Sequence, residues 1–224
     1  MKTIGVLGGM GPESTAYAYM QMIKFCQREY NAKLDSDFPS IMIYNLPVPD
    51  VVELKDNERN VLDALEYGID KLKAAGVDFV FIPCNSMDRF VPVLRRKTEV
   101  LSIVEETLKE MKKLGLKNAG LLATETTIAS NHYQEKFEKE AINILLPENQ
   151  KQVTRSIREI LEGKKQEPRK RILQLINELQ GRGADAVILG CTDLPLAINQ
   201  EDVQIKLFDT TAIIAKAAVK KYYQ

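Results

Sequence analysis

Two cysteines each close a short apolar run at the point where it gives way to a polar turn. Cys84 ends the segment "GVDFVFIPC" (76–84), and Cys191 ends the segment "GADAVILGC" (183–191). The two segments align without a gap at a constant offset of 107 residues (191 − 84). A thiolate is both a nucleophile and an acid–base group. A matched pair of thiols therefore suits a reaction in which two equivalent groups act on one substrate.

The elements that would position these cysteines follow a regular alternation. Strands are expected at 3–8, 40–46, 78–83, 118–124, 142–147 and 185–190. Helices are expected at 12–30, 58–76, 104–114, 131–139, 150–162, 169–180 and 211–223. Short apolar runs that alternate with segments of helical period predict an α/β fold, with mostly parallel sheets covered by helices on both faces.

Two further pairs of segments repeat in the same order as the cysteine segments. "KTIGVLGGM" (2–10) matches "KNAGLLATE" (117–125), and "SIMIYNL" (40–46) matches "AINILLP" (141–147). One such match can arise by chance, but an ordered set of three is hard to explain that way. The chain is therefore predicted to contain two similar, pseudo-symmetric α/β lobes in tandem.

The duplication gives the two thiols a specific chemistry. Ligands of open parallel sheets bind beyond the carboxyl ends of the strands, which is where both cysteines lie. If the lobes face each other, one thiol can remove a proton from a carbon while the other returns a proton to the opposite face, which is racemisation. The alternative is that each cysteine is only a small buried apolar residue. Cys26 lies in an amphipathic helix without a matching partner and is interpreted as packing.

Two polar loops at strand ends are suited to a small anion. In "GGMGPEST" (8–15), three glycines allow backbone N–H groups to turn toward a ligand, although tight packing is an equal explanation. The loop lacks the lysine of a Walker motif and the third glycine of a dinucleotide fingerprint. In "ATETT" (123–127), Thr124 and Thr127 are candidates to bind a carboxylate or an amino group.

The overall composition excludes several classes of function. The 224 residues contain 31 Lys plus Arg and 31 Asp plus Glu, so no net charge would attract nucleic acid or an anionic membrane. No apolar run approaches the roughly 18 residues of a membrane span. A single histidine, His132, argues against a multi-histidine metal site. Three cysteines without a short-spaced pair fit free thiols in a reducing cytoplasm.

Four motifs together resemble the aspartate/glutamate racemase family over essentially the whole chain. They are "IGVLGGMGPEST", "PCNS", "LLATETT" and "GCTDLPL", and they are most similar to the aspartate racemase branch. The resemblance implies a first lobe of residues 1–106 and 208–224, a second lobe of residues 107–207, and an active site in the cleft between them. It also implies a homodimer that racemises a small anionic amino acid without pyridoxal phosphate, a metal ion or another cofactor.

The resemblance also implies roles for individual residues. Cys84 and Cys191 would be the two catalytic acid–base residues. Asn85, Ser86, Thr127 and Thr192 would hold the α-carboxylate and the amino group, and Met10 and Thr15 would line the entrance. Lys165 would reach the side-chain carboxylate of the substrate.

Three positions depart from the family pattern. Asp88 stands where a histidine is usual, Asp193 stands where a glutamate is usual, and Val51 stands where aspartate racemases tend to carry an arginine. Both aspartates are candidate proton relays. Without the arginine, Lys165 replaces a bidentate carboxylate clamp only in part. The predicted substrate is accordingly aspartate or glutamate.

Two other readings of the sequence stay open. The first is a thiol enzyme of the same fold with a different substrate, such as a maleate isomerase-like enzyme, a hydantoin racemase or another amino-acid racemase. An arylmalonate decarboxylase works with one cysteine, so the matched pair counts against it. The second is a protein that binds a small anion without catalysis.

Overall fold

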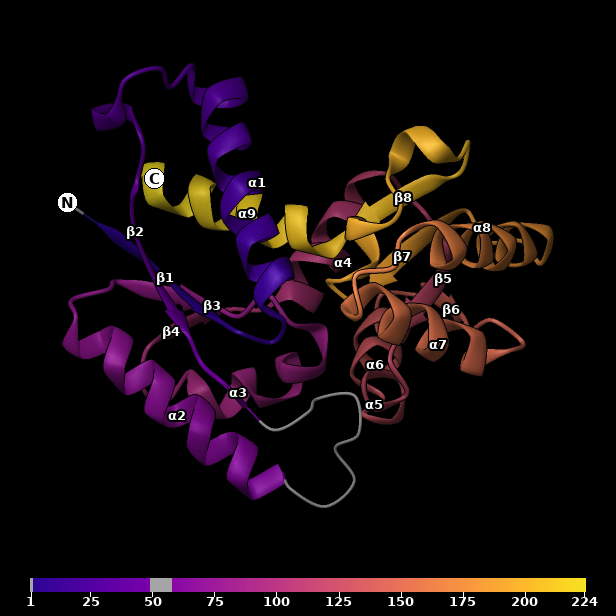
Figure 1. Cartoon of the computed structure of the whole chain (residues 1–224), viewed down its shortest axis with the longest axis horizontal. Coiled ribbons are helices and arrows are strands. Elements are labelled where there is room, and N and C mark those ends of the chain that lie inside the picture. The colour runs from indigo at the N-terminus through magenta and orange to yellow at the C-terminus, as the bar shows by residue number, and fades with distance from the viewer. Residues whose placement is uncertain (1, 49–57) are drawn as a thin grey trace. The chain divides into compact units, whose positions relative to one another are not determined.

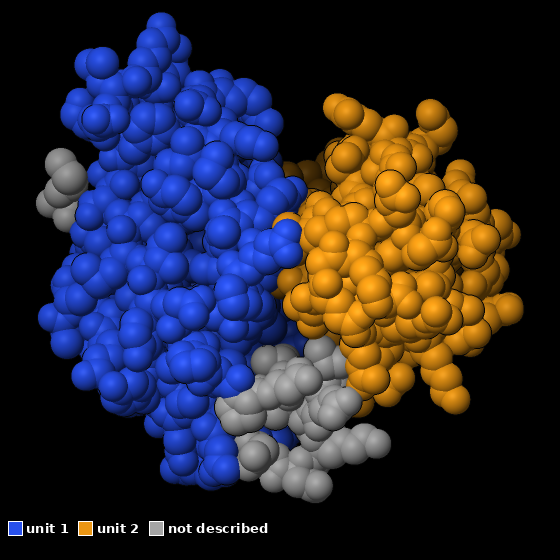
Figure 2. Space-filling view, in the orientation of Figure 1, with its two compact units in different colours: residues 1–106, 211–224 blue, residues 107–210 orange. Residues whose placement is uncertain are grey.

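The computed structural model describes residues 2–48 and 58–224 of the chain. The chain forms two compact units, Met1–Glu106 with Thr211–Gln224 and Thr107–Thr210 (Figure 2). Each unit contains a four-stranded sheet of parallel pairs with flanking helices (Figure 1). The predicted α/β fold with two lobes is therefore confirmed. Val51, where the sequence lacks the family's arginine, lies outside the described residues.

The first unit is built on a sheet with the strand order β2-β1-β3-β4. Its strands are β1 (Thr3–Gly8), β2 (Ser40–Asn45), β3 (Phe79–Phe81) and β4 (Glu99–Leu101). Its helical segments are α1 (Pro12–Tyr30), η1 (Asp35–Asp37), α2 (Glu58–Ala74), η2 (Asn85–Phe90), α3 (Val91–Leu94), the start of α4 (Ile103–Lys113) and most of α9 (Thr210–Tyr223). An apolar stripe of α2 is buried in the core, namely Val61, Leu65, Ile69 and Leu72.

The second unit repeats this arrangement with the strand order β6-β5-β7-β8. Its strands are β5 (Asn118–Ala123), β6 (Asn143–Leu145), β7 (Ala186–Gly190) and β8 (Lys206–Asp209). Its helical segments are the rest of α4, α5 (Glu125–Ala129), α6 (His132–Glu138), α7 (Gln150–Leu161), α8 (Gln166–Gly181), η3 (Leu194–Leu196) and η4 (Gln200–Asp202). The two sheets therefore share one topology.

The internal repeat extends to the turns that lead into the cysteine strands. Gly76 follows α2 with φ +86°, and Gly183 follows α8 with φ +91°. This left-handed backbone favours glycine and ends a helix by returning an N–H group to its last turn. The returning bonds are Val77 N–H to the Leu72 carbonyl (3.3 Å) and Ala184 N–H to the Leu179 carbonyl (3.0 Å).

In each lobe, one aspartate joins the cysteine strand to the first strand of the sheet, and the two aspartates occupy matched positions. Asp78 Oδ2 accepts a hydrogen bond from Thr3 N–H (2.6 Å) at the start of β1. Asp185 Oδ2 accepts bonds from Lys117 N–H (2.9 Å) and Asn118 N–H (2.8 Å) at the start of β5. The same residue type thus makes the same connection in both lobes.

The fourth strand of each sheet was not predicted from the sequence. β4 has 3 residues and β8 has 4, and each lies at an edge of its sheet. Such short segments carry too few residues to show an alternating pattern. The paired register aligns Phe81 with Leu101 and Ile188 with Phe208, so each unpredicted strand lies beside a cysteine strand.

The C-terminal helix α9 is anchored within the first unit. The Tyr223 ring stacks on Tyr30 with 4.0 Å between centroids, and its hydroxyl donates to the Asp37 carbonyl (2.5 Å). Burial is the main cause that raises the pKa of Tyr223 to about 12. Burial also raises the pKa of the Cys26 thiol, which a hydrogen bond with Tyr223 partly offsets. Cys26 is fully buried in α1, as the packing interpretation requires.

Candidate active site

Cys84 lies where β3 ends and the 3₁₀ segment η2 begins. Its N–H donates to the Ile82 carbonyl (2.8 Å), which folds the chain sharply around Pro83. Only 5% of the Cys84 surface is exposed, and the following Asn85 and Ser86 are also buried. The sequence prediction that these three residues share one strand-end turn agrees with the structure.

The glycine-rich loop after β1 uses its own hydroxyl groups to bind its backbone. Gly9 N–H donates to Thr15 Oγ1 (2.9 Å), and Thr15 Oγ1 donates to the Gly11 carbonyl (2.8 Å). A Cβ at Gly8 would lie 2.2 Å from the Cγ2 atom of Thr15, so no larger residue fits there. Tight packing therefore accounts for Gly8. Met10 is buried in the same apolar cluster as Cys84.

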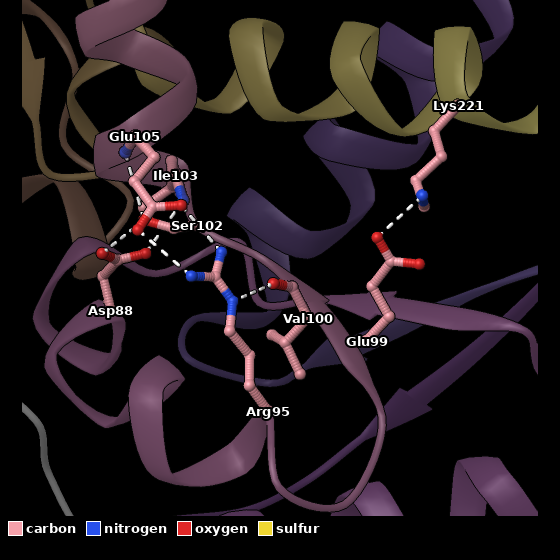
Figure 3. A network of polar contacts seen from close by, with 8 residues as sticks. All are labelled: Asp88, Arg95, Glu99, Val100, Ser102, Ile103, Glu105 and Lys221. Carbon is pink, nitrogen blue, oxygen red and sulfur yellow. Dashed lines mark hydrogen bonds and ion pairs between the residues drawn. The ribbon is translucent and has the colours of Figure 1, made fainter.

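Asp88 occupies the same turn but is bound to the beginning of α4. Its carboxylate accepts hydrogen bonds from Ser102 Oγ (2.7 Å) and from Ile103 N–H (2.9 Å), as Figure 3 shows. These partners follow β4, which was not predicted from the sequence. The connection between Asp88 and α4 was missed for the same reason.

Arg89 is a polar residue of this turn that the sequence reasoning did not consider. Its Nη1 atom pairs with Glu58 (2.8 Å), and its guanidinium lies over the Phe90 ring at 4.7 Å. The Nε and Nη2 atoms are buried and have no hydrogen-bond partner among the described residues. Buried donors of this kind call for an acceptor, and a carboxylate matches the fork geometry of arginine. The sequence feature that could have identified Arg89 is its position five residues after the strand-end Cys84.

Cys191 directly follows β7 in the second lobe and has a carboxylate within reach. Its Sγ atom donates to Asp193 Oδ2 at 3.6 Å. Cys191 is 8% exposed, and Thr192 and Asp193 are likewise buried. A thiol that donates to a carboxylate can pass its proton along that hydrogen bond. The second lobe thus contains a thiol that is hydrogen-bonded to a buried carboxylate.

The two predicted threonines form a pair beside the end of β5. Thr124 caps α5 by accepting a hydrogen bond from Thr127 N–H (3.1 Å). The two Oγ1 atoms lie 3.0 Å apart, and both side chains are buried. β5 and β7 are neighbouring parallel strands, with Ala123 aligned with Gly190, so the threonine pair and Cys191 follow the same edge of the sheet.

Lys165 precedes α8 and is half-buried. It lines a pocket of about 280 Å³ together with Gln166, Arg169, Lys170 and Leu173. Arg169 forms an ion pair with Asp202, and Lys170 pairs with Glu167 at 2.8 Å. Three basic side chains therefore line this pocket, and two of them are paired with carboxylates.

The family model described as Asp/Glu/Hydantoin racemase matches residues 7–218. The chain belongs to this family. The match confirms the resemblance drawn from the four motifs and identifies the protein as an isomerase of the racemase type.

Individual members of the racemase family are similar over almost the whole chain. The broad-specificity amino-acid racemase RacX of Bacillus subtilis is 32% identical over 222 residues, which cover 98% of this chain and 97% of RacX. The structure of Picrophilus torridus aspartate racemase is 28% identical with a TM-score of 0.90, covering 100% of this chain and 95% of that one. An aspartate racemase homologue from Pyrococcus horikoshii is 26% identical with a TM-score of 0.84, covering both chains fully.

The racemase structure places the predicted site residues in two groups, one in each lobe. β1 and β3 are parallel neighbours, so Met10, Thr15, Cys84, Asn85 and Ser86 all follow the carboxyl edge of the first sheet. Thr124, Thr127, Cys191, Thr192 and Asp193 follow the carboxyl edge of the second sheet. No helix in the described part of the chain has the length and apolarity needed to cross a membrane. No group of three metal-ligating side chains occurs among the same residues.

Proposed function

We propose that this protein is a cofactor-independent amino-acid racemase that uses Cys84 and Cys191 as its two bases, with aspartate or glutamate as the substrate. The observation that carries the proposal is the matched position of the two buried thiols at the strand ends of a duplicated lobe. Its membership of the racemase family supports the reaction class.

Proton transfer would begin at one thiol and end at the other. Asp193 accepts the Cys191 hydrogen bond and is placed to take the thiol proton. The resulting thiolate removes the proton from Cα and leaves a carbanion, and the Cys84 thiol returns a proton to the opposite face. Cys84 is then the thiolate and Cys191 the thiol, so the reverse reaction starts from the product. Asp193 then still holds the proton that it took from Cys191. Release of that proton and uptake of one by the Cys84 thiolate restore the starting state, so charge and protons balance over the cycle.

Buried polar groups around each thiol would stabilise the charge that develops on the substrate. Asn85 and Ser86 in the first lobe, and Thr124, Thr127 and Thr192 in the second, provide amide and hydroxyl donors. Donors held in place before the reaction stabilise a developing carbanion more effectively than water does. We assign them to the α-carboxylate and the amino group, with Met10 and Thr15 along the entrance.

Two cations are candidates for the side-chain carboxylate of the substrate. Lys165 lines the basic pocket at the start of α8, and Arg89 has two buried donors that lack a partner among the described residues. Arg89 would supply the bidentate contact that the arginine missing at Val51 would otherwise make. The relative RacX is described as having broad specificity, so neutral amino acids belong in the test. We further propose that the enzyme is a cytoplasmic homodimer.

The test is proton NMR in D₂O with separate L- and D-forms of aspartate, glutamate and several neutral amino acids. We expect loss of the α-proton signal and formation of the opposite enantiomer for an acidic substrate, and loss of racemisation in Cys84→Ala and Cys191→Ala. Arg89→Gln and Lys165→Gln should raise KM for acidic substrates more than for neutral ones. A stable thioether adduct would indicate maleate isomerase-like chemistry instead. Ligand binding that survives alkylation of both cysteines, without turnover, would indicate a binding protein.

A further inference from the structure

Asp88 is a buried carboxylate on the turn that carries Cys84. Only 2% of its surface is exposed. Aspartate is seldom buried this completely unless its carboxylate is paired or hydrogen-bonded. Its partners therefore indicate why the residue is there.

Both oxygens of Asp88 bind the first residues of the helix α4. Ser102 Oγ donates to Oδ2 at 2.7 Å, and Ile103 N–H donates to Oδ1 at 2.9 Å (Figure 3). Ile103 is the first residue of α4, and N–H groups at a helix start have no acceptor within the helix. The helix dipole also favours a negative charge at this end. Asp88 thus caps α4 from a different loop.

The start of α4 is itself held firmly by neighbouring side chains. Ser102 Oγ accepts a hydrogen bond from Glu105 N–H (3.1 Å), as an N-cap residue does. Arg95 binds the Glu105 carboxylate through Nη1 (3.2 Å) and Nη2 (2.7 Å) and the Val100 carbonyl through Nε (2.9 Å), as Figure 3 shows. The Asp88 carboxylate is therefore bound to a part of the first lobe that several other hydrogen bonds hold in place.

The pairing of β3 with β4 explains why the hydrogen bonds of Asp88 constrain the turn that carries Cys84. β3 and β4 are parallel neighbours, with Phe81 aligned with Leu101. The chain leaves both strands at the same edge, toward Cys84 from one strand and toward Ser102 from the other. Asp88 bridges these two exits. A hydrogen-bonded bridge at this point limits the movement of the turn that carries the thiol.

We propose that Asp88 is a positioning residue, whose carboxylate clamps the Cys84–Ser86 turn to the start of α4 and so fixes the Cys84 thiol against the substrate. The catalytic consequence rests on the proposed function of Cys84 as a base. A misplacement of about 1 Å at a reacting group can cost on the order of 100-fold in rate. The clamp therefore affects catalysis without Asp88 exchanging a proton.

Two substitutions at Asp88 separate a clamp from a proton relay. Asp88→Asn keeps a carbonyl oxygen for Ile103 N–H, and its amide can donate to Ser102, but it cannot titrate. Asp88→Ala removes both bonds. We expect Asp88→Asn to keep kcat within about tenfold of the wild type with an unchanged pH–rate profile, and Asp88→Ala to lose about 100-fold. Equal losses in both variants with an altered pH profile would show that Asp88 transfers protons and would overturn the clamp.

A second readout follows Cys84 without any turnover. Iodoacetamide modification of Cys84 and Cys191 is measured separately by peptide mass spectrometry on the folded protein. We expect Asp88→Ala to speed modification of Cys84 more than fivefold and to leave Cys191 unchanged, whereas Asp88→Asn matches the wild type. If Asp88→Ala does not fold, Ser102→Ala, which removes one of the two bonds, should speed modification of Cys84 by a smaller factor. Unchanged Cys84 modification in these variants would overturn the proposal.

Glu105→Gln is the matched control, because it weakens the Arg95 pair while leaving both bonds of Asp88 in place. It should lower the midpoint of thermal unfolding without changing kcat or Cys84 modification. Failure of the proposed racemase function and failure of the proposed Asp88 clamp give different results in these two measurements. If the wild type racemises no amino acid while Asp88→Ala still exposes Cys84 and Asp88→Asn does not, the proposed function is wrong and the clamp stands.

Discussion

The two lobes place a thiol at the same strand end but give it different carboxylate neighbours. In the second lobe, Asp193 lies two residues after Cys191 and accepts the hydrogen bond of the thiol. In the first lobe, Asp88 lies four residues after Cys84 and binds the beginning of the next helix. Under the proposed mechanism, the surroundings of Cys191 would serve proton transfer, whereas those of Cys84 would serve positioning.

The joints between the last strand and the following helix differ in a related way. In the first lobe, Ile103 at the start of α4 donates its N–H group to Asp88 (2.9 Å). In the second lobe, Thr210 at the start of α9 donates its hydroxyl to the Leu189 carbonyl of β7 (2.9 Å). Both joints bind the helix start to the cysteine-bearing segment, but the groups that do so differ. A duplicated fold can therefore keep its geometry while its hydrogen-bonding groups change.

The largest expected effect is the fall in racemisation rate when one of the two proposed bases is removed. Cys84→Ala and Cys191→Ala should each reduce racemisation on the order of 10²–10⁴-fold, the range of a general acid–base contribution. Each remaining thiol should still exchange the Cα proton on its own face, so the two variants should exchange opposite enantiomers. Proton NMR in D₂O with pure L- and D-substrate measures this. Exchange of the same enantiomer by both variants would contradict two bases on opposite faces.

A smaller effect is expected from neutralising the carboxylate beside Cys191. Asp193→Asn should lower kcat by about 10- to 100-fold, because the thiol loses its proton acceptor. Removal of a nearby negative charge favours the thiolate, so iodoacetamide should modify Cys191 up to about tenfold faster at pH 7. Cys84 modification should not change. The exposed Asp63→Asn serves as the control, and an unchanged rate of Cys191 modification in Asp193→Asn would show that Asp193 does not act on this thiol.

Local sequence signals predicted most of the fold and both cysteine turns. Gly76 and Gly183 mark the helix ends, and the apolar runs after them identify the strands that lead to the thiols. These features depend on neighbours within a few residues. The repeat at a constant offset made the match between Cys84 and Cys191 visible without any structure.

Contacts between distant residues were beyond the reach of the sequence. Asp88 binds Ser102 and Ile103, which are 14 and 15 residues away, and they follow a strand of only 3 residues. Arg89 likewise pairs with Glu58 on another element. Hydropathy and spacing identify elements but not which side chains meet when they pack. The sequence therefore indicated that Asp88 was unusual but not which residues it binds.

The helix starts provide a comparison of stability between the lobes. Ser102→Ala removes an N-cap and one donor to Asp88, and should destabilise the protein by about 1–2 kcal/mol. Thr210→Val removes one hydrogen bond to a carbonyl at nearly constant volume, and should cost about 1 kcal/mol. Urea unfolding followed by circular dichroism measures both variants. A larger loss of stability in Thr210→Val than in Ser102→Ala would show that the joint between β8 and α9 stabilises the protein more than the joint between β4 and α4.

Alanine substitution at the two matched glycines should lower the free energy of unfolding by equal amounts. Gly76 and Gly183 have φ values of +86° and +91°, and a Cβ at either position would meet no atom within 4 Å. Alanine should therefore introduce only backbone strain, about 1–2 kcal/mol at each site. Urea unfolding of Gly76→Ala and Gly183→Ala tests this. Effects that differ by more than the strain itself would show that the two turns are not equivalent.

The smallest expected effect is the dependence of stability on pH at Asp185. Hydrogen bonds from the N–H groups of Lys117 and Asn118 lower the pKa of this carboxyl below its usual value. Its contribution to stability is therefore full above the unfolded-state pKa of about 3.9 and is lost as the pH falls through the lower folded-state value. Because Asp185 is exposed, solvent keeps the contribution small. The difference in unfolding free energy between the wild type and Asp185→Asn should shrink as the pH falls below about 4. A difference that stays constant down to pH 2 would show that the strand connection depends on shape, with no contribution from the carboxylate charge.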